Sequence, residues 1–332
     1  MKNKTILITG GTGSFGQRFS EKILQNNQIK KLIIFSRDEM KQYEMKKKFS
    51  KLKGYEKIRF FIGDVRDYDR IKLALNNVDI VVHAAALKIV DTAEYNPIEF
   101  IKTNIYGAEN IIKACLETKV KKVIALSTDK AVNPINLYGA SKLAADKLFI
   151  AANNLSGKLK TIFSVVRYGN VVGSRGSIIP FFKELNKNKS KFFPITDNKM
   201  TRFWISLEEG VEFVIKNLRK MHGGEIFIPK MPSFRIIDLA SAINKSKPKK
   251  IIGIRPGEKI HEILCSMDES HSTYEFRDYY IIYPTITFQN LNLKYYKKKI
   301  LKGGKLVTKN FEYTSFNNKN YLTIKEIEKK TK

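Results

Sequence analysis

The residues best suited to chemistry lie in one stretch, Ser127 to Lys142, which follows the apolar run Val123 to Leu126. That run is typical of a short buried strand, and a helical pattern follows the stretch. If the helix begins near Tyr138, then Tyr138 and Lys142, four residues apart, share one of its faces. A lysine there lowers the pKa of the phenol, which can then remove a hydroxyl proton during hydride transfer. Taken alone, the spacing also fits two surface residues on an amphipathic helix.

Asp129 and Lys130 add a second acid and base directly after the strand, where parallel sheets present groups to a ligand. A simple dehydrogenase or 4-epimerase needs only Tyr138, Lys142 and a hydroxyl residue such as Thr128. The additional pair fits a dehydration. Once carbon 4 of a sugar is a ketone, a base can remove the acidified proton on carbon 5 while an acid protonates the leaving hydroxyl on carbon 6.

A glycine-rich loop stands near the start of the chain. The buried run Thr5 to Ile8 leads into Gly10-Gly-Thr-Gly-Ser-Phe-Gly16, and an amphipathic segment from Gln17 to Leu24 follows. Glycines at this spacing allow a tight turn, close approach to a pyrophosphate and close helix packing, with the helix N-terminus facing the phosphates. The residues predicted to bind the cofactor here are Gly10, Thr12, Gly13, Ser14, Phe15 and Gly16.

The residues after the second strand favour NADP over NAD. The run from Lys31 to Phe35 ends in Ser36, Arg37 and Asp38, with Lys41 close behind. About twenty positions after the last glycine, an acidic residue selects NAD, whereas an arginine accommodates the 2′-phosphate of NADP. The alternative is that Arg37 simply pairs with a neighbouring carboxylate.

The third and fourth strands, predicted over Ile58 to Ile62 and Val78 to Val82, should also end at the cofactor. An aspartate after the third can accept from the adenine amino group, and small residues after the fourth let the backbone run beside the cofactor. The residues predicted there are Asp64, Val65, Ala84, Ala85, Ala86 and, facing the cleft, Lys88. The alternation predicts a Rossmann-like, doubly wound parallel sheet. We expect an NADP-binding domain over residues 1–170, joined by some later segments, and a smaller C-terminal substrate lobe over 171–332.

Composition excludes several classes of protein. The chain has 332 residues, 43% of them hydrophobic, which is enough for a large core in two lobes. The net charge of +29 would fit a nucleic-acid binder, but the lysines are spread along the chain and no nucleic-acid-binding motif is present. Two cysteines and four histidines without paired spacing make neither a disulfide framework nor a metal site. No run approaches the ~18 apolar residues of a membrane span, and no signal-peptide pattern occurs, so a cytoplasmic protein is expected.

Two motifs carry a family resemblance. The Gly-x-x-Gly-x-x-Gly spacing resembles the extended short-chain dehydrogenase/reductase superfamily. The stretch from Ser127 to Lys142 is similar to that of the inverting UDP-N-acetylglucosamine 4,6-dehydratases of pseudaminic acid biosynthesis, where retaining dehydratases carry Asp-Glu in place of Asp129-Lys130. The resemblance runs from Thr5 to about Thr287.

This resemblance implies a role for each residue of the motif. Lys130 would be the base and Asp129 the acid, with Tyr138 and Lys142 as the hydride-transfer pair. For Lys130 to be neutral its pKa must be lowered, by burial or by nearby lysines. Asn104 would hold a water-linked proton path to the active-site lysine. The implied substrate-binding residues are Lys88, Asn170, Val171, Arg175, Gly176, Ser177, Ile178, Ile179, Arg202, Arg255 and Glu258.

The resemblance also implies NADP as cofactor, UDP-N-acetylglucosamine as substrate, a homo-oligomer, and a place in surface or flagellin glycosylation. The enzymatic alternatives are a capsule-pathway dehydratase and a UDP-sugar 4-epimerase in which Asp129 and Lys130 are idle. The non-enzymatic alternative is an NADP-sensing or nucleic-acid-binding Rossmann protein, which the charge suggests. It predicts salt-sensitive RNA or DNA binding without sugar turnover.

Overall fold

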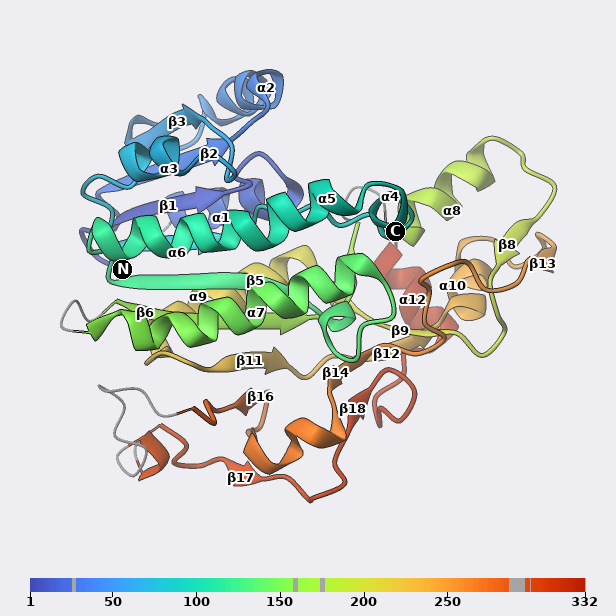
Figure 1. The fold of residues 1–332 in the computed structure, drawn as a ribbon. Helices are drawn as coiled ribbons and strands as arrows, with labels where there is room; N and C mark the ends of the chain where they lie inside the picture. Colours follow the sequence, from blue (N-terminus) through green and yellow to red (C-terminus); the bar gives the residue numbers. More distant parts are fainter. Residues whose placement is uncertain (26–27, 158–160, 174–176, 287–295, 299, 332) are drawn as a thin grey trace.

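A ten-stranded sheet forms the centre of the larger lobe in the computed structural model, which describes residues 1–25, 28–157, 161–173, 177–286, 296–298 and 300–331 (Figure 1). Most strands in the parallel part of the sheet are short buried runs, as expected where helices cover both faces of a parallel sheet. In spatial order they are β17 (Lys305–Leu306), β15 (Thr273–Glu275), β16 (Tyr279–Ile282), β11 (Ile226–Pro229), β6 (Ile162–Tyr168), β5 (Lys122–Thr128), β4 (Ile80–His83), β1 (Thr5–Thr9), β2 (Lys31–Ser36) and β3 (Ile58–Ile62).

The strands from β11 to β3 run parallel, and β4 lies beside β1 on the side opposite β2. The strand order therefore reverses between β1 and β4, and ligands of such sheets bind beyond the carboxyl ends of the strands at that point. This arrangement confirms the predicted Rossmann-like sheet. The fourth strand begins at Ile80 rather than Val78, because the amide of Val78 bonds to the carbonyl of Leu75 and closes a turn through Asn77, whose φ is 57°.

Helices cover both faces of this sheet (Figure 1). Side chains cap several of them; for example, Asp38 accepts a bond from the amide of Lys41, and Asn136 accepts one from the amide of Gly139. Helices α6 and α7 pack together on one face, and α1 and α9 pack together on the other. The bounds are α1 (Ser14–Gln25), α2 (Glu39–Phe49), α3 (Tyr68–Ala74), α4 (Val90–Tyr95), α5 (Pro97–Phe100), α6 (Gly107–Glu117), α7 (Leu137–Leu155) and α9 (Leu207–Lys220).

A smaller lobe has its own apolar core, centred on the buried side chains of Phe182, Phe193, Trp204 and Leu239. The C-terminal helix packs on α10, so the end of the chain returns to this lobe. The elements of the lobe are α8 (Ile178–Lys187), β8 (Phe193–Ile195), β9 (Thr201–Phe203), β12 (Ser233–Arg235), α10 (Ile236–Ile243), β13 (Lys249–Ile251) and α12 (Ile324–Thr331). Short pairs complete the fold, β7 (Val171–Val172) with β10 (Ile205–Ser206) and β14 (Ile263–Cys265) with β18 (Tyr313–Thr314).

The strands β11, β15, β16 and β17 belong to the large sheet although they follow residue 170. The domain division at that residue stays a prediction. None of the helices in the described part of the chain combines the length and apolar character needed to cross a bilayer.

Candidate active site

The glycine-rich loop lies tightly against the loop that follows β4. Gly10 has a φ of +63°, and a Cβ at this position would come within 3.0 Å of the backbone of Ala84 and Ala85. The hydroxyl of Thr9 accepts bonds from the amides of Ala84 and Ala85, at 3.1 and 3.2 Å. A Cβ on Gly16 would lie 2.4 Å from the carbonyl oxygen of Gly11. Only glycine fits this cradle of backbone at the start of α1, which suits a pyrophosphate.

The remaining predicted residues of this loop lie in the same place. Gly13 donates its amide to the carbonyl of Gly10 at 2.9 Å, Thr12 is buried, and Ser14 and Phe15 open α1. Val65 is buried against Gly107 at the start of α6.

Arg37 follows β2 and pairs with Asp64 after β3, its Nη1 lying 3.5 Å from Oδ2. Asp38 instead caps α2 and binds Lys41, so the expected alternative partner of Arg37 is occupied elsewhere. Burial alone would raise the pKa of Asp64, but Arg66, at 2.7 Å, and then Arg37 lower it below its usual value. Half of the Arg37 side chain is exposed, so its guanidinium can contact an anionic group on a ribose. The hydroxyl of Ser36 accepts a bond from Gln42 at 3.0 Å.

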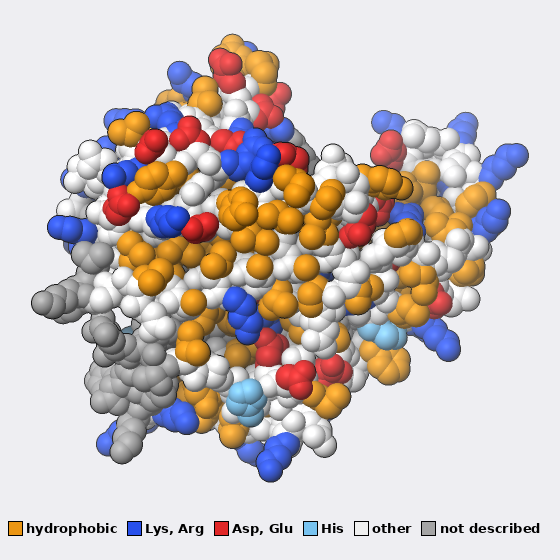
Figure 2. All heavy atoms as spheres, viewed as in Figure 1, with side chains coloured by type: hydrophobic (Ala, Val, Ile, Leu, Met, Phe, Trp, Pro, Cys, Tyr) orange, Lys and Arg blue, Asp and Glu red, His pale blue; other side chains and the backbone are white. Residues whose placement is uncertain are grey.

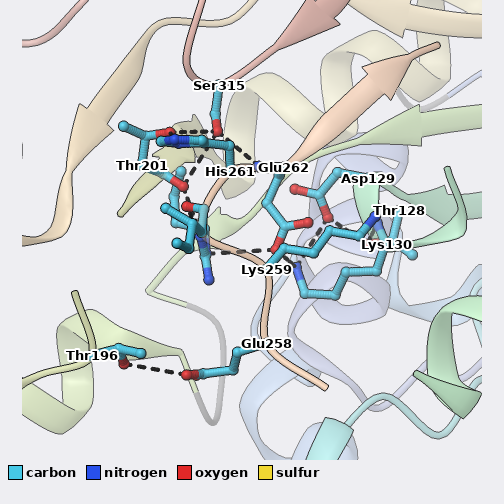
Figure 3. A network of polar contacts seen from close by, with 12 residues as sticks. Thr128, Asp129, Lys130, Thr196, Thr201, Glu258, Lys259, His261, Glu262 and Ser315 are labelled. Carbon is cyan, nitrogen blue, oxygen red and sulfur yellow. Dashed lines mark hydrogen bonds and ion pairs between the residues drawn. The ribbon is translucent and has the colours of Figure 1, made fainter. Parts of the chain in front are cut away.

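The acid and base lie in a 3₁₀ turn, Asp129–Ala131, between β5 and α7 (Figure 3). Oδ1 of Asp129 accepts bonds from the hydroxyl of Thr128 at 2.9 Å and from Nζ of Lys130 at 3.0 Å. Oδ2 of Asp129 is buried and has no hydrogen-bond partner among the described residues. Burial raises the pKa of Asp129, and Glu262 adds to the effect against the opposing charge of Lys130. A raised pKa suits a carboxyl group that delivers a proton.

Glu262, which sequence reasoning missed, is the second partner of Lys130. Its Oε1 lies 3.1 Å from Nζ of Lys130, and its side chain is 2% exposed (Figure 3). Burial alone would lower the pKa of Lys130, but Asp129 and Glu262 outweigh it and raise the pKa above its usual value. The expected lowering of this pKa is therefore wrong in direction. One feature of the sequence could have pointed to Glu262: it stands next to the apolar run Ile263 to Cys265, where a strand is buried. A carboxylate buried there needs a cation as partner.

Tyr138 and Lys142 lie in the first turns of α7, which begins at Leu137, so they share a helix face as their spacing predicted, and both are buried. The ammonium of Lys142 donates to the carbonyl of Leu126 at 2.8 Å, and burial lowers its pKa. Burial raises the pKa of Tyr138 to about 12, and the strongest opposing charge is that of Lys130 rather than Lys142. The pKa of Tyr138 was expected to be lowered by Lys142, and the structure differs because the ammonium of Lys142 is bound to the backbone of β5.

Asn104 lies in a π-helical segment, Ile101–Tyr106, a form that is frequent at functional sites. Its amide nitrogen donates to the carbonyl of Leu87 at 3.0 Å and to the hydroxyl of Ser141 at 2.9 Å. Its oxygen accepts a bond from the amide of Leu87 at 2.9 Å. Asn104 therefore fixes the loop before Lys88 to the start of α7. Burial, and then the charge of Lys130, lower the pKa of Lys88.

Two predicted substrate residues, Asn170 and Ser177, follow β6 on the way to α8 of the smaller lobe. Oδ1 of Asn170 and the hydroxyl of Ser177 are buried without hydrogen-bond partners among the described residues, as expected of groups that bind a ligand. Oε2 of Glu258 accepts a bond from Thr196 at 3.2 Å (Figure 3). Val171 lies in β7, Ile178 and Ile179 begin α8, and Arg255 is exposed. Arg175 and Gly176 lie outside the described residues.

Arg202 is turned inward rather than toward solvent. Its Nη1 donates to the carbonyls of Thr201 and Ile260, at 2.8 and 3.1 Å. Its Nε lies 3.6 Å from Oε1 of Glu262, which binds Lys130 with the same oxygen. Arg202 therefore contacts the acid–base group through Glu262. Its predicted contact with phosphate stays a prediction.

Comparison with known proteins identifies the family. A model described as Polysaccharide biosynthesis protein matches residues 6–284. The chain belongs to this family. Among its relatives, a UDP-N-acetylglucosamine 4,6-dehydratase (inverting) from Campylobacter jejuni is 56% identical over 324 residues, which is 98% of this chain and 96% of the relative. The predicted resemblance is confirmed.

A second relative carries another activity. A UDP-glucose 4-epimerase from Rickettsia bellii is 44% identical over 333 residues, covering 98% of this chain and 94% of the relative. Among solved structures, that of Pen from Bacillus thuringiensis has 37% identity and a TM-score of 0.88, over 99% of this chain and 97% of that one. A dTDP-glucose 4,6-dehydratase from Streptomyces venezuelae, with NAD bound, shares the fold at 18% identity and a TM-score of 0.69, over 92% of each chain.

Proposed function

We propose that the protein is an NADP-dependent, inverting 4,6-dehydratase of UDP-N-acetylglucosamine. The observation that carries this proposal is the contact of 3.0 Å between Nζ of Lys130 and Oδ1 of Asp129, beside the buried Tyr138 and Lys142. An acid and a base in contact are what loss of water requires in addition to hydride transfer. The 56% identity to an inverting dehydratase supports the same activity.

Each residue has one task in this reaction. A bound nicotinamide would take the hydride from carbon 4 and return it at carbon 6. Tyr138 holds the hydroxyl on carbon 4 and accepts its proton. For this step the pKa of Tyr138, about 12 in this structure, must be lowered by positive charge at the site. Asp129 protonates the hydroxyl leaving carbon 6, and Lys130 removes the proton from carbon 5. Return of a proton to the other face of carbon 5 gives inversion, and the net change is loss of water.

The nucleotide half of the substrate would lie against the smaller lobe. Among the residues that the structure describes, the oxygen of Asn170 and the hydroxyl of Ser177 have no partner and are available to it, and Arg255 is an exposed cation on the segment that carries Glu258. Arginine binds diphosphates through its planar, bidentate donors. Arg37 would hold the 2′-phosphate of NADP in the same way.

A UDP-sugar 4-epimerase is the second candidate, because the Rickettsia bellii relative carries that name. Epimerisation returns the hydride to carbon 4 and gives Asp129 and Lys130 no task. Their buried contact in this chain favours the dehydratase.

The resemblance supports three further proposals: a pathway, a location and self-association. The product would enter pseudaminic acid synthesis for surface or flagellin glycosylation. The protein would act in the cytoplasm, and its two free, buried cysteines fit that reducing compartment.

The protein would also associate with copies of itself. The proposed contact is the outer face of α6 and α7, over which apolar side chains gather (Figure 2).

The proposed contact surface includes the exposed Ala140, Ala151 and Leu155 on α7, and it extends to the exposed Ile98 on α5 and Tyr106 on the π-helical segment before α6. Its alanines on α7 allow a second copy of the chain to approach closely, as small residues do between packed helices. Light scattering would give a dimer or larger assembly for the natural chain and a smaller species for Ala151→Glu. The same mass for both proteins would contradict this surface.

The deciding experiment is incubation with UDP-N-acetylglucosamine in heavy water, followed by proton NMR. A 4-keto-6-deoxy sugar with deuterium at an inverted carbon 5 is expected. A sugar inverted at carbon 4 without loss of water would establish the epimerase. No turnover of this or other UDP-sugars would overturn both.

A further inference from the structure

Glu262 occupies an unusual place for an acidic side chain. It precedes β14, is almost fully buried, and carries an oxygen, Oε2, without a hydrogen-bond partner in the described part of the chain. Its other oxygen lies 3.1 Å from Nζ of Lys130 and 3.6 Å from Nε of Arg202 (Figure 3). Two cations therefore share one carboxylate oxygen inside the protein. Burying a carboxylate is costly unless it is paired, so Glu262 needs at least one cation beside it, and here it has two.

The backbone of Glu262 is held independently of its side chain. Its amide donates to the hydroxyl of Ser315 at 2.9 Å, and its carbonyl accepts a bond from the amide of Ser315 at 2.8 Å. The carboxylate is consequently aimed at Lys130 from a fixed point. Lys130 itself lies between two carboxylates, with Asp129 at 3.0 Å on one side and Glu262 on the other.

We propose that Glu262 is a positioning residue: its carboxylate holds Lys130 against Asp129 and governs the passage of one proton between those two groups. This inference rests on the proposed dehydratase activity, which needs a neutral base and a protonated acid at the same time. In the resting arrangement Lys130 is an ammonium and Asp129 a carboxylate. Transfer of one proton along their 3.0 Å contact breaks an N–H bond of Lys130 and forms an O–H bond on Asp129.

The charges balance before and after this transfer. Before it, Lys130 and Arg202 face the two carboxylates of Asp129 and Glu262. After it, Lys130 and Asp129 are both neutral, while Glu262 and Arg202 remain as an ion pair. The transfer therefore needs no proton from solvent, and it leaves no buried charge unpaired. It supplies the base for carbon 5 and the acid for the leaving hydroxyl in a single step.

Glu262 opposes this transfer because its negative charge stabilises the ammonium. Glu262 itself stays ionised. Burial would raise its pKa, but Lys130 and then Arg202 lower the pKa below its usual value. Removal of its charge should lower the pKa of Lys130 and make the neutral base available at lower pH. The charged and titratable groups that face Lys130 are Asp129, Glu262, Arg202, Tyr138, Lys88 and Lys259.

The test replaces Glu262 by glutamine, which keeps the shape and removes the charge. The rate of dehydration would be measured against pH for the natural chain, Glu262→Gln and Glu262→Asp. Glu275→Gln is the matched control, since it removes a carboxylate that pairs with a lysine, Lys230, at the surface. In the pH–rate profile, the rise that follows deprotonation of Lys130 should move to lower pH by about one unit or more in Glu262→Gln. It should stay unchanged in the control, and move less in Glu262→Asp.

A second measurement needs no turnover. Acetic anhydride reacts with neutral lysine only, and mass spectrometry gives the extent of labelling of Lys130 at each pH. The midpoint for Lys130 should fall in Glu262→Gln by the same amount as the rise in the pH–rate profile. Thermal unfolding shows whether each variant is folded. Should Glu262→Gln not fold, Glu262→Asp decides, because its retracted carboxylate must shift the midpoint in the same direction.

The outcomes separate the two proposals. If the natural chain dehydrates the sugar but neither midpoint moves in a folded variant, the role of Glu262 is overturned and the dehydratase stands. If no sugar is turned over but labelling of Lys130 shifts, the charge coupling is supported and the dehydratase fails. A shift of equal size in Glu275→Gln would also overturn the inference, because it would show an effect of net charge alone.

Discussion

The side chain of Asn136 bonds to two parts of the protein at once. Its Nδ2 donates to the carbonyl of Gly257 at 2.7 Å, and its Oδ1 accepts from the amide of Gly139 at 2.7 Å. The first bond ties the start of α7 to the segment with Arg255 and Glu258, and the second caps α7. Lys259 adds another tie, donating to the carbonyl of Val132 at 2.6 Å. The predicted substrate segment and the catalytic turn are thus joined.

The two bonds of Asn136 can be separated by mutation. Asn136→Ser keeps an oxygen for the cap but is too short to donate to Gly257, so we expect a higher KM for the nucleotide sugar with little loss of stability. Asn136→Ala loses both bonds, and should be less stable than Asn136→Ser by about 1 kcal/mol. Urea unfolding and steady-state kinetics on both variants check this. An unchanged KM in Asn136→Ser would show that the tie to Gly257 does not position substrate.

Removal of Lys130 should separate the two halves of the reaction. In Lys130→Ala, Tyr138 and Lys142 are intact, so one turnover of hydride transfer to the cofactor should remain visible as near-ultraviolet absorbance. Release of water should fall by at least about 100-fold, because general acid–base groups contribute factors of that size. NADP binding should be unchanged. Lys113→Ala, on the exposed side of α6, is the control.

Two results would argue against this assignment. Normal dehydration by Lys130→Ala would move the role of base to another residue. If both the absorbance signal and dehydration are lost, Lys130 is needed for hydride transfer as well. Its charge lowers the pKa of Tyr138, which is a route for that effect.

Arg37 should select the cofactor. Arg37→Ala is expected to weaken NADP far more than NAD, since only NADP carries the 2′-phosphate. Arg66→Ala is the control, because Arg66 also pairs with Asp64 but is not a predicted ligand. Calorimetric titration of both cofactors measures the effect. An equal loss for NADP and NAD, or the same selectivity change in Arg66→Ala, would contradict a contact with the phosphate.

The sheet and its loops were predictable because their signals are local. Buried strands such as β1 and β5 are continuous apolar runs, and the glycines after β1 stand where the backbone approaches Ala84. The face shared by Tyr138 and Lys142 follows from helix geometry alone. These features depend on neighbours in the chain, which the sequence displays directly.

The electrostatics of the site could not be predicted in the same way. In the sequence Lys130 stands next to one carboxylate, that of Asp129. Folding brings a second carboxylate, that of Glu262, from a segment much later in the chain. That contact reverses the expected direction of the pKa of Lys130. Likewise, the tie between Lys142 and the carbonyl of Leu126 depends on how α7 packs on β5. Long-range pairing decides such values, and no local pattern encodes it.

His83 should make stability depend on pH. It ends β4, is 2% exposed, and has its Nδ1 2.9 Å from the hydroxyl of Thr9. Burial, and then the charge of Lys142, lower its pKa from 6.5 to about 3. The unfolded chain therefore binds a proton below pH 6.5 that the folded chain does not take up until about pH 3. The contribution of neutral His83 is complete above pH 6.5 and is lost as pH falls, by about 1.4 kcal/mol per unit.

The measurement is the free energy of unfolding in urea at several pH values between 6.5 and 5. The natural chain should lose stability more steeply than His83→Asn, and the difference between their slopes should approach about 1.4 kcal/mol per pH unit. His222→Asn is the control, since His222 is exposed and its replacement should leave the slope as it is. Parallel curves for the natural chain and His83→Asn would mean that His83 takes up its proton without unfolding, and that its burial does not resist charge.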